Sequence, residues 1–312
     1  MGIVLGVDGG NSKTELVAAT TDGMVLARVR GPGSNSHAIG AAGVGGVIAD
    51  LVAAAGIPTP VGHGVFFLCG ADVPSDISEL EDVVAQHAFA AESQVDNDTF
   101  ALLRAGTDRA DAVAVICGSG INCVGRSADG RVARYPSLGW ETGDWGGSEM
   151  LGREALFLAA RAEDGRGLPS VLVDLVKEHF GVSSVEAVGA DVHYRRLPQA
   201  RLAELAPKVV AAAGGDAVAA ALVDRLANEI VLMARRALAD LAVEEGDVVL
   251  GGGMFQGGGA TLLDRVAEAL PEGARPVVPV APPVLGAALA ALDAAGADAA
   301  AKDRLRKELG GG

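Results

Sequence analysis

The 312-residue chain has little cysteine, few basic residues and no long uninterrupted apolar run. Its three cysteines, Cys69, Cys117 and Cys123, are odd in number, stand in apolar surroundings and have no CxxC spacing. This argues against a disulfide framework and a zinc site, so we expect them to be small packing residues. Charge or glycine interrupts the apolar stretches before about 18 residues, and no basic segment with an apolar signal core opens the chain. We therefore expect no membrane span, no secretion and a cytoplasmic location.

Acidic residues outnumber basic ones by 40 to 25, which gives a net charge of −15 and a pI near 4.7. Such a chain has no clustered basic surface to replace the counterions of a nucleic acid, so no nucleic-acid partner is expected. A small anion can still bind, because backbone N–H groups and Mg²⁺ act locally. With 50% hydrophobic residues the chain can bury substantial cores. Its length suggests about two domains.

The first segment with binding chemistry begins where the apolar run of residues 3–7 ends at Asp8. A small-residue loop follows, and we predict that it binds phosphate through Gly9, Gly10, Asn11, Ser12, Lys13 and Thr14. Paired glycines let backbone N–H groups approach phosphate oxygens, two hydroxyls add donors, and Asp8 can hold hydrated Mg²⁺. The loop is not a P-loop, because Ser12 rather than glycine precedes Lys13 and a strand-turn-strand pattern follows. An ordinary hairpin turn is the alternative.

A second loop of the same kind, residues 118–120, follows a buried-type strand at residues 112–116. Cys123 stands where a dinucleotide-binding motif needs its third glycine, so a Rossmann helix is not expected. Both loops lead through a strand to an Asp-Gly hairpin, which predicts a duplicated α/β domain whose two hairpins grip a nucleotide's phosphates from both sides. Coincidental similarity is the alternative. Residues 251–253 follow a strand at residues 247–250 and allow close backbone approach to a flat ligand such as adenine.

Two acidic residues follow predicted strands. Residues 65–68 form a core strand that leads to Asp72, and residues 95–97 lead to Asp98. At the carboxyl end of its strand, Asp98 would accept a proton from a substrate hydroxyl. The alternative is structural, since Asp96 or Asp98 can cap the helix that follows. Helical spacing also covers residues 80–87, 171–180, 201–213 and 218–241.

Residues 138–149 combine glycine with both tryptophans of the chain and three carboxylates. A sugar site needs this mixture, because aromatic rings cover the apolar face of a pyranose while carboxylates bind its hydroxyls. The alternative is a structured loop whose tryptophans fill the core.

Together these motifs resemble the BadF/BadG/BcrA/BcrD family of actin-like, hexokinase-fold ATPases, and its N-acetylglucosamine kinases in particular, nearly end to end. The matching pieces, in order, are residues 8–14, 33–35, 69–72, 97–98, 118–122, 139–140 with 143–144, and 251–253. The resemblance implies an α/β protein with two duplicated ribonuclease-H-like lobes and a central cleft, its N-terminal lobe over residues 1–111 and its C-terminal lobe over residues 112–312. The final helix would pack back on the N-terminal lobe. The oligomeric state is left open, a homodimer included.

The resemblance further implies ATP- and Mg²⁺-dependent transfer of the γ-phosphate to the 6-hydroxyl of N-acetylglucosamine. Asp98 would be the general base, and Asp8 would hold Mg²⁺ through water. Nucleotide and phosphate contacts would come from Gly9, Gly10, Asn11, Ser12, Lys13, Thr14, Gly118, Ser119, Gly120, Gly251, Gly252 and Gly253. Sugar contacts would come from Asn35, Gly70, Ala71, Asp72, Asn97, Asn122, Trp140, Glu141 and Asp144.

Two departures leave the sugar open. Cys69 stands where similar sugar kinases commonly place a hydroxyl residue, and residues 145–147 give a longer loop after Asp144 than animal relatives have. A glucosamine kinase is therefore an alternative, because the ammonium of glucosamine would favour an acidic neighbour such as Glu141. The family's activators of acyl-CoA dehydratases or reductases need cluster-ligating cysteines that this chain does not evidently supply. A nucleotide-dependent sensor or chaperone-like ATPase is a third class.

Overall fold

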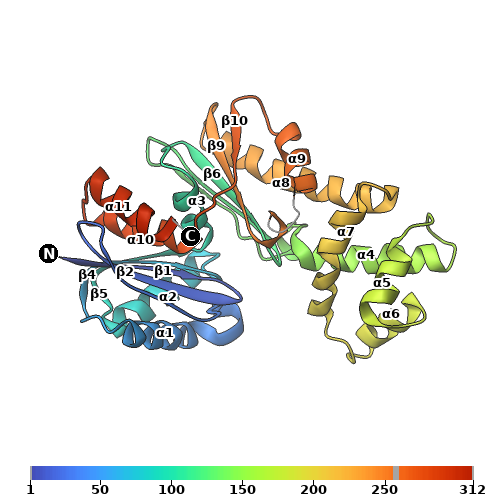
Figure 1. Ribbon diagram of the computed structural model, residues 1–312, viewed down its shortest axis with the longest axis horizontal. Helices are drawn as coiled ribbons and strands as arrows, with labels where there is room; N and C mark the ends of the chain where they lie inside the picture. The colour runs from blue at the N-terminus through green and yellow to red at the C-terminus, as the bar shows by residue number, and fades with distance from the viewer. Residues whose placement is uncertain (1, 256–259, 311–312) are drawn as a thin grey trace. The chain divides into compact units, whose positions relative to one another are not determined.

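The computed structural model describes residues 2–255 and 260–310, and its residues form two compact units. Unit 1 consists of Met1–Ala114, Val124–Pro136 and Val277–Gly312, and unit 2 consists of Val115–Cys123 and Ser137–Pro276. The chain therefore crosses between the units repeatedly, and its C-terminal segment belongs to unit 1 (Figure 1). The lobe boundary predicted at residues 111–112 and the central cleft stay predictions.

Five strands form the sheet of unit 1 in the order β3-β2-β1-β4-β5. Their bounds are β1 Ile3–Gly9, β2 Lys13–Thr20, β3 Val25–Pro32, β4 Val61–Leu68 and β5 Ala90–Asn97. Strand β1 is antiparallel to β2 and parallel to β4, and β4 is parallel to β5. The register pairs Gly9 with Leu68 and Leu68 with Asn97, so β1, β4 and β5 end at one edge of the sheet. The loops that leave these strands therefore start side by side.

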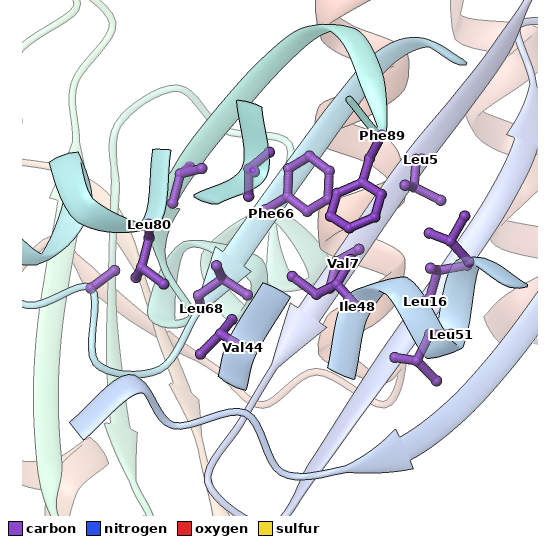
Figure 2. Packing of buried hydrophobic residues seen from close by; sticks show 14 of the residues in the cluster. Leu5, Val7, Leu16, Val44, Ile48, Leu51, Phe66, Leu68, Leu80 and Phe89 are labelled. Atoms are coloured by element: carbon purple, nitrogen blue, oxygen red, sulfur yellow. The ribbon is translucent and has the colours of Figure 1, made fainter. Parts of the chain in front are cut away.

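Helices cover both faces of this sheet. Their bounds are α1 Ser36–Ala55, α2 Pro74–His87, α3 Thr99–Gly106, α10 Pro283–Ala294 and α11 Ala299–Gly310. Successive side chains of a strand point to opposite faces, so one strand serves two cores. Leu5 and Val7 of β1 pack in one core with Ile48 of α1 (Figure 2). Val4 packs in the other core with Val284 of α10.

Glycine allows α10 to approach its neighbours closely. A Cβ atom at Gly6 of β1 would overlap the backbone of Ala287 and Ala288 in α10. A Cβ atom at Gly286 of α10 would overlap the carbonyl of Ala101 in α3. The C-terminal segment is therefore an integral layer of unit 1, since larger residues at these positions would push α10 away.

Among the described helices, α1 is the one that is long and apolar enough to cross a membrane by length and composition. Its residues Ala41, Val44, Ile48 and Leu51 are buried in the core of unit 1. One face of this helix therefore packs against the core of unit 1.

A second five-stranded sheet has the order β10-β9-β6-β7-β8. Its strands are β6 Ala112–Cys117, β7 Ile121–Arg126, β8 Val132–Arg134, β9 Gly246–Gly251 and β10 Ala274–Val277. In each sheet the first strand lies in the middle, the next two follow on one side, and the last two lie on the other. The repeated order confirms the α/β fold class and the predicted duplication.

Most of the remaining chain in unit 2 is helical. The bounds are η1 Trp140–Thr142, α4 Gly147–Glu163, α5 Leu172–Phe180, α6 Val185–His193, η2 Gln199–Leu205, α7 Ala206–Ala212, α8 Ala217–Asp240, η3 Gly253–Phe255 and α9 Ala260–Ala269. The α-helix predicted over residues 201–213 is wrong in its first half, where η2 is a 3₁₀ helix. Pro207 explains the break, because it lacks the N–H that a continuous helix needs and suits the first turn of α7.

Candidate functional site

Backbone hydrogen bonds join the loops at the carboxyl edge of unit 1. The N–H of Cys69 donates to the Gly9 carbonyl at 2.6 Å, and the N–H of Ser36 donates to the Cys69 carbonyl at 3.2 Å. Gly70 has a φ of +86°, and its carbonyl accepts the Ser36 hydroxyl at 3.0 Å. A Cβ atom at Gly70 would overlap that hydroxyl. The loops after β1, β3 and β4 are therefore held as one surface.

The predicted phosphate loop of unit 1 is the tight turn between β1 and β2. The N–H of Gly10 donates to the Lys13 carbonyl at 2.9 Å, and Asn11 and Ser12 are exposed at the tip. Nδ2 of Asn35 donates to Oδ1 of Asn11 at 3.2 Å. The structure thus brings a predicted phosphate residue and a predicted sugar residue into contact.

Two members of this loop are engaged within the fold. Thr14 is fully buried, and its hydroxyl donates to Oγ of Ser34 at 2.8 Å. The ammonium of Lys13 pairs with Glu15 at 2.5 Å, and Glu15 also pairs with Arg28 at 3.0 Å. The buried hydrogen bond of Thr14 therefore fixes the base of the loop, and the Lys13 ammonium is paired with the Glu15 carboxylate.

Three aspartates at this edge have raised pKa values. Burial raises the pKa of Asp8 to about 8, and the negative charge of Asp98 adds to the effect. Burial and the charge of Asp72 raise the pKa of Asp98 to about 7. Burial raises the pKa of Asp72 to about 6, although His37 opposes the shift. A cation or a proton would stabilise such a cluster, and clusters of this kind are typical of functional sites.

The Cys69 thiol lies among these carboxylates. Burial raises its pKa, and the charges of Asp98, Asp72 and Asp8 raise it further. The thiol therefore stays protonated and is a poor nucleophile or metal ligand. The other two cysteines are fully buried, and burial also raises their pKa values. All three are free, as packing residues would be.

Three consecutive residues at the end of β5 have different partners. Both carboxylate oxygens of Asp96 bind Arg134. Nδ2 of Asn97 donates to Asp72 at 2.7 Å, and Oδ1 of Asn97 accepts the first N–H of α3 at 2.9 Å. Asp98 stands at the N-cap position of α3, yet its side chain makes no capping hydrogen bond. The capping alternative is therefore right about the position of Asp98 and wrong for Asp96, and it is the side chain of Asn97 that accepts the first N–H of the helix.

In unit 2 the glycine loops after β6 and β9 lie together. The N–H of Gly118 donates to the Gly120 carbonyl at 2.9 Å, which closes a tight turn. The first turn of α4 donates to this turn, from Ser148 to Gly118 at 2.8 Å and from Glu149 to Ser119 at 3.0 Å. Gly252, between Gly251 and Gly253, has a φ of +94°, and a Cβ atom there would overlap the Cys117 carbonyl. The predicted nucleotide residues of unit 2 therefore occupy the ends of two neighbouring strands.

The two tryptophans of the loop over residues 138–149 have opposite environments. Trp145 is buried, and the Arg225 guanidinium lies 4.0 Å from its ring centroid. Trp140 is 68% exposed on η1. The core-filling alternative is therefore correct for Trp145, and Trp140 has a ring surface accessible to a ligand.

Polar contacts fix the rest of this loop. The Thr142 hydroxyl donates to the Asp144 carboxylate. Oδ1 of Asn122 in β7 accepts the Ser137 hydroxyl at 2.7 Å, which ties the start of the loop to the sheet. Glu141 is exposed beside Trp140. The structure thus brings the predicted sugar residues of unit 2 onto one preformed loop and its neighbouring strand.

Sequence reasoning missed His37. Its Nδ1 lies 3.9 Å from Asp72, and its Nε2 lies 3.4 Å from Asp76. The N–H of His37 donates to the side chain of Asn35, which caps α1. The sequence around Asn35 indicates the start of a helix, but nothing in it indicates that His37, the second residue of that helix, lies near Asp72.

Asp8 fits a residue that holds Mg²⁺. Its side chain is largely buried, and within residues 2–255 and 260–310 no ion pair neutralises its carboxylate. Carboxylate oxygens are the ligands that Mg²⁺ prefers, and Asp8 stands directly before the glycine turn. A cation here would offset the mutual repulsion of the three aspartates.

The two equivalent sheets, with glycine turns after their central strands, define the class of the protein as a ribonuclease-H-like α/β fold of the actin and hexokinase type. The chain belongs to the BadF/BadG/BcrA/BcrD ATPase family, whose profile matches residues 5–291. The predicted family is confirmed.

Known relatives carry kinase names. The chain is 29% identical over 259 residues to the N-acetylmuramic acid/N-acetylglucosamine kinase of Clostridium acetobutylicum, covering 80% of this chain and 84% of the relative. It is 27% identical over 208 residues to the N-acetyl-D-glucosamine kinase of Dictyostelium discoideum, covering 59% and 62%.

Solved structures agree in fold. A proposed N-acetylglucosamine kinase from Chromobacterium violaceum superposes with a TM-score of 0.72 at 26% identity, over 93% of this chain and 98% of the other. A ROK family glucokinase from Streptomyces griseus, solved with glucose and AMPPNP, has a TM-score of 0.58 at 19% identity, over 94% and 100%. At this identity the second comparison shows the shared fold alone.

Proposed function

We propose that the protein is an ATP-dependent amino-sugar kinase that transfers the γ-phosphate to the 6-hydroxyl of N-acetylglucosamine. The observation that carries the proposal is Asp98, a carboxylate with a raised pKa at the end of β5, grouped with Asp8 and Asp72. Membership of an ATPase family and the names of two relatives support it. The substrate is a small sugar in the cytoplasm, and the acidic chain has no expected nucleic-acid or membrane partner.

Asp98 is assigned as the general base. It accepts the proton of the sugar hydroxyl while the hydroxyl oxygen bonds to the γ-phosphorus and the bond from that phosphorus to ADP breaks. A pKa near the working pH suits this role, because the group must be ionised and still hold a proton well. Most of the acceleration comes from positioning and charge neutralisation.

The nucleotide is assigned to the three glycine turns. We assign phosphate oxygens to the N–H groups of residues 9–12 and 118–120, and adenosine to residues 251–253. Asp8 would hold Mg²⁺ through water, and bound Mg²⁺ neutralises charge on the transferring phosphate. Thr14 acts indirectly, because its hydroxyl supports the turn through Ser34.

As the resemblance implies, the sugar contacts are assigned to Asn35, Gly70, Ala71, Asp72, Asn97, Asn122, Trp140, Glu141 and Asp144. The exposed ring of Trp140 would cover the apolar face of the pyranose. Asp72 is held by Asn97 and would accept hydrogen bonds from hydroxyls.

A coupled ADP-release assay tests the reaction. The panel contains hexoses, hexosamines, N-acetylhexosamines and N-acetylmuramic acid, each at a fixed concentration of Mg·ATP. We expect N-acetylglucosamine to give the largest sugar-dependent ADP release. Equal release with and without every sugar would reject the kinase and leave an ATPase, and a brown, iron-containing preparation would identify an acyl-CoA dehydratase or reductase activator.

Glucosamine is the alternative substrate, favoured by the exposed carboxylate of Glu141 beside Trp140. If glucosamine binds through its ammonium, Glu141→Gln should raise its KM and leave that of N-acetylglucosamine nearly unchanged. Glu149→Gln is the matched control, because Glu149 is an exposed carboxylate nearby on α4. Equal effects of both variants would exclude a specific pairing with Glu141.

A further inference from the structure

A surface cavity of about 300 Å³ in unit 1 gathers three arginines. It is lined by residues of β4, β5, α3, β7, β8 and α10, and its guanidinium groups belong to Arg104, Arg126 and Arg134. Asp96 and Asp293 supply two carboxylates. The lining is therefore net positive in a protein whose formal charge is −15.

Two of these arginines are neutralised by the fold. Nε of Arg104 donates to Asp293 at 2.7 Å, and Nη1 of Arg104 donates to Asp108 at 2.7 Å. Arg134 binds both oxygens of Asp96. Their charges are matched by carboxylates, so they need no ligand.

Arg126 has no carboxylate in direct contact within the described part of the chain. Its Nε is buried and has no hydrogen-bond partner anywhere in the described ranges 2–255 and 260–310, and its side chain forms no ion pair there. Burial and the positive charge of Arg104 lower its pKa, although the carboxylates of Asp293 and Asp108 oppose the shift. A half-buried guanidinium whose buried Nε has no acceptor is unfavourable, so removal of its charge should not destabilise the protein. A bound anion would supply the missing acceptor.

Strand β5 separates the cavity from the acid cluster that Asp8, Asp72 and Asp98 form. Successive residues of a strand point to opposite faces. Asn97 donates to Asp72 in the cluster, whereas Asp96 binds Arg134 in the cavity. The cavity is therefore distinct from the proposed sugar and phosphate contacts of unit 1, although it lies against β5, the strand that leads to Asp98.

We propose that this cavity binds a small anion through a phosphate or carboxylate group, with Arg126 as the main contact. The guanidinium fork matches both groups and offers them two parallel hydrogen bonds. Phe100, Leu103 and Val132 also line the cavity and would pack against the non-polar part of an organic anion.

Calorimetric titration of the full chain tests the site with two probes, inorganic phosphate and butyrate. Saturating Mg²⁺ and a non-hydrolysable ATP analogue are present in every titration, so that phosphate does not report the glycine turns. Arg126→Gln removes the charge, and Arg30→Gln is the matched control because Arg30 is an exposed arginine of the same unit. Neither residue belongs to the proposed catalytic machinery.

We expect at least one probe to bind the wild type and the Arg30→Gln variant equally, and to bind Arg126→Gln about 10-fold or more weakly. Which probe binds distinguishes phosphate from carboxylate. Without either probe, Arg126→Gln should melt at the same temperature as the wild type or higher, because it removes an unpaired buried group. No binding of either probe, equal binding to Arg126→Gln, or a lower melting temperature of that variant would each overturn the proposal.

Discussion

Replacement of Asp98 by asparagine tests the acid cluster of Asp8, Asp72 and Asp98 through two quantities, because turnover should fall while the stability of the fold rises. Asparagine has nearly the same shape but cannot carry the charge that burial and Asp72 disfavour. If Asp98 is the base, turnover should fall by roughly 10²- to 10⁴-fold. The folded protein should meanwhile become more stable, because a charge that is unfavourable in the native state is gone.

The size of the stability gain follows from the pKa of Asp98, which rises from 3.8 to about 7 on folding. One pKa unit corresponds to about 1.4 kcal/mol, so the full shift sets an upper limit of about 4 kcal/mol. Asp98 is partly exposed and shares its shift with Asp72, so we expect a gain of about 1–3 kcal/mol.

The sign of the pH dependence is fixed by the same shift. Between its ordinary pKa and about 7, folded Asp98 holds more protons than the unfolded chain, so wild-type stability falls as the pH rises. The asparagine side chain of the variant cannot titrate in this window. The stability difference between the variant and the wild type should therefore be absent below pH 3.8 and complete above about pH 7.

Urea unfolding without Mg²⁺, at about pH 5 and about pH 8, measures the difference, and turnover is measured with Mg·ATP and N-acetylglucosamine. Asp96→Asn is the matched control: Asp96 binds Arg134 with both oxygens, so its loss should lower stability and leave turnover largely intact. A less stable Asp98→Asn protein at pH 8 would refute the reasoning about the cluster. Near-normal turnover of Asp98→Asn together with an inactive Asp96→Asn would refute the choice of base.

Three further perturbations separate the parts of the site. Asp8→Ala should weaken the Mg²⁺ dependence of turnover far more than equilibrium sugar binding, and an unchanged Mg²⁺ titration would make Asp8 a turn carboxylate only. Sugar should change the fluorescence of the Trp145→Phe protein, where Trp140 remains exposed, and a response confined to the Trp140→Phe protein would contradict the stacking role. Gly252→Ala should raise the KM for ATP about tenfold or more because its Cβ would overlap the Cys117 carbonyl. Gly189→Ala is the control, because Gly189 on α6 has open space around it and belongs to no proposed contact. Equal KM values of the two variants would place adenosine elsewhere.

The sequence predicts the sheets well because their signals are local. An apolar run that ends in a glycine turn and resumes as a strand indicates β1 and β2, and the same pattern recurs at β6 and β7. The repeat then predicts the duplication. Pro207 was also a local signal, but the prediction of one α-helix over residues 201–213 did not take it into account and was wrong there.

The details of the site depend on partners that are distant in sequence. Thr14 was expected to contact phosphate, but the loop after β3 places Ser34 next to it, and the Thr14 hydroxyl donates to Ser34 instead. The two tryptophans look alike in sequence, and Arg225 of α8 accompanies only Trp145. The arginine cavity combines residues from α3, β7, β8 and α10, so no single segment predicts it.

The acid cluster persists because the fold leaves its carboxylates little room to separate. Asp8 and Asp98 stand at the ends of β1 and β5, strands of one sheet that buried cores cover on both faces. Asp72 is held by Asn97, whose own N–H is held by Asp96. The repulsion between these carboxylates must therefore be reduced by a cation or by a proton rather than by movement of the side chains. In the proposed reaction these are the groups that arrive, since Mg²⁺ would bind at Asp8 and the sugar hydroxyl would release its proton to Asp98. The native state thus retains an unfavourable electrostatic energy that its substrates remove, which is why loss of the Asp98 charge should both stabilise the protein and strongly lower its turnover.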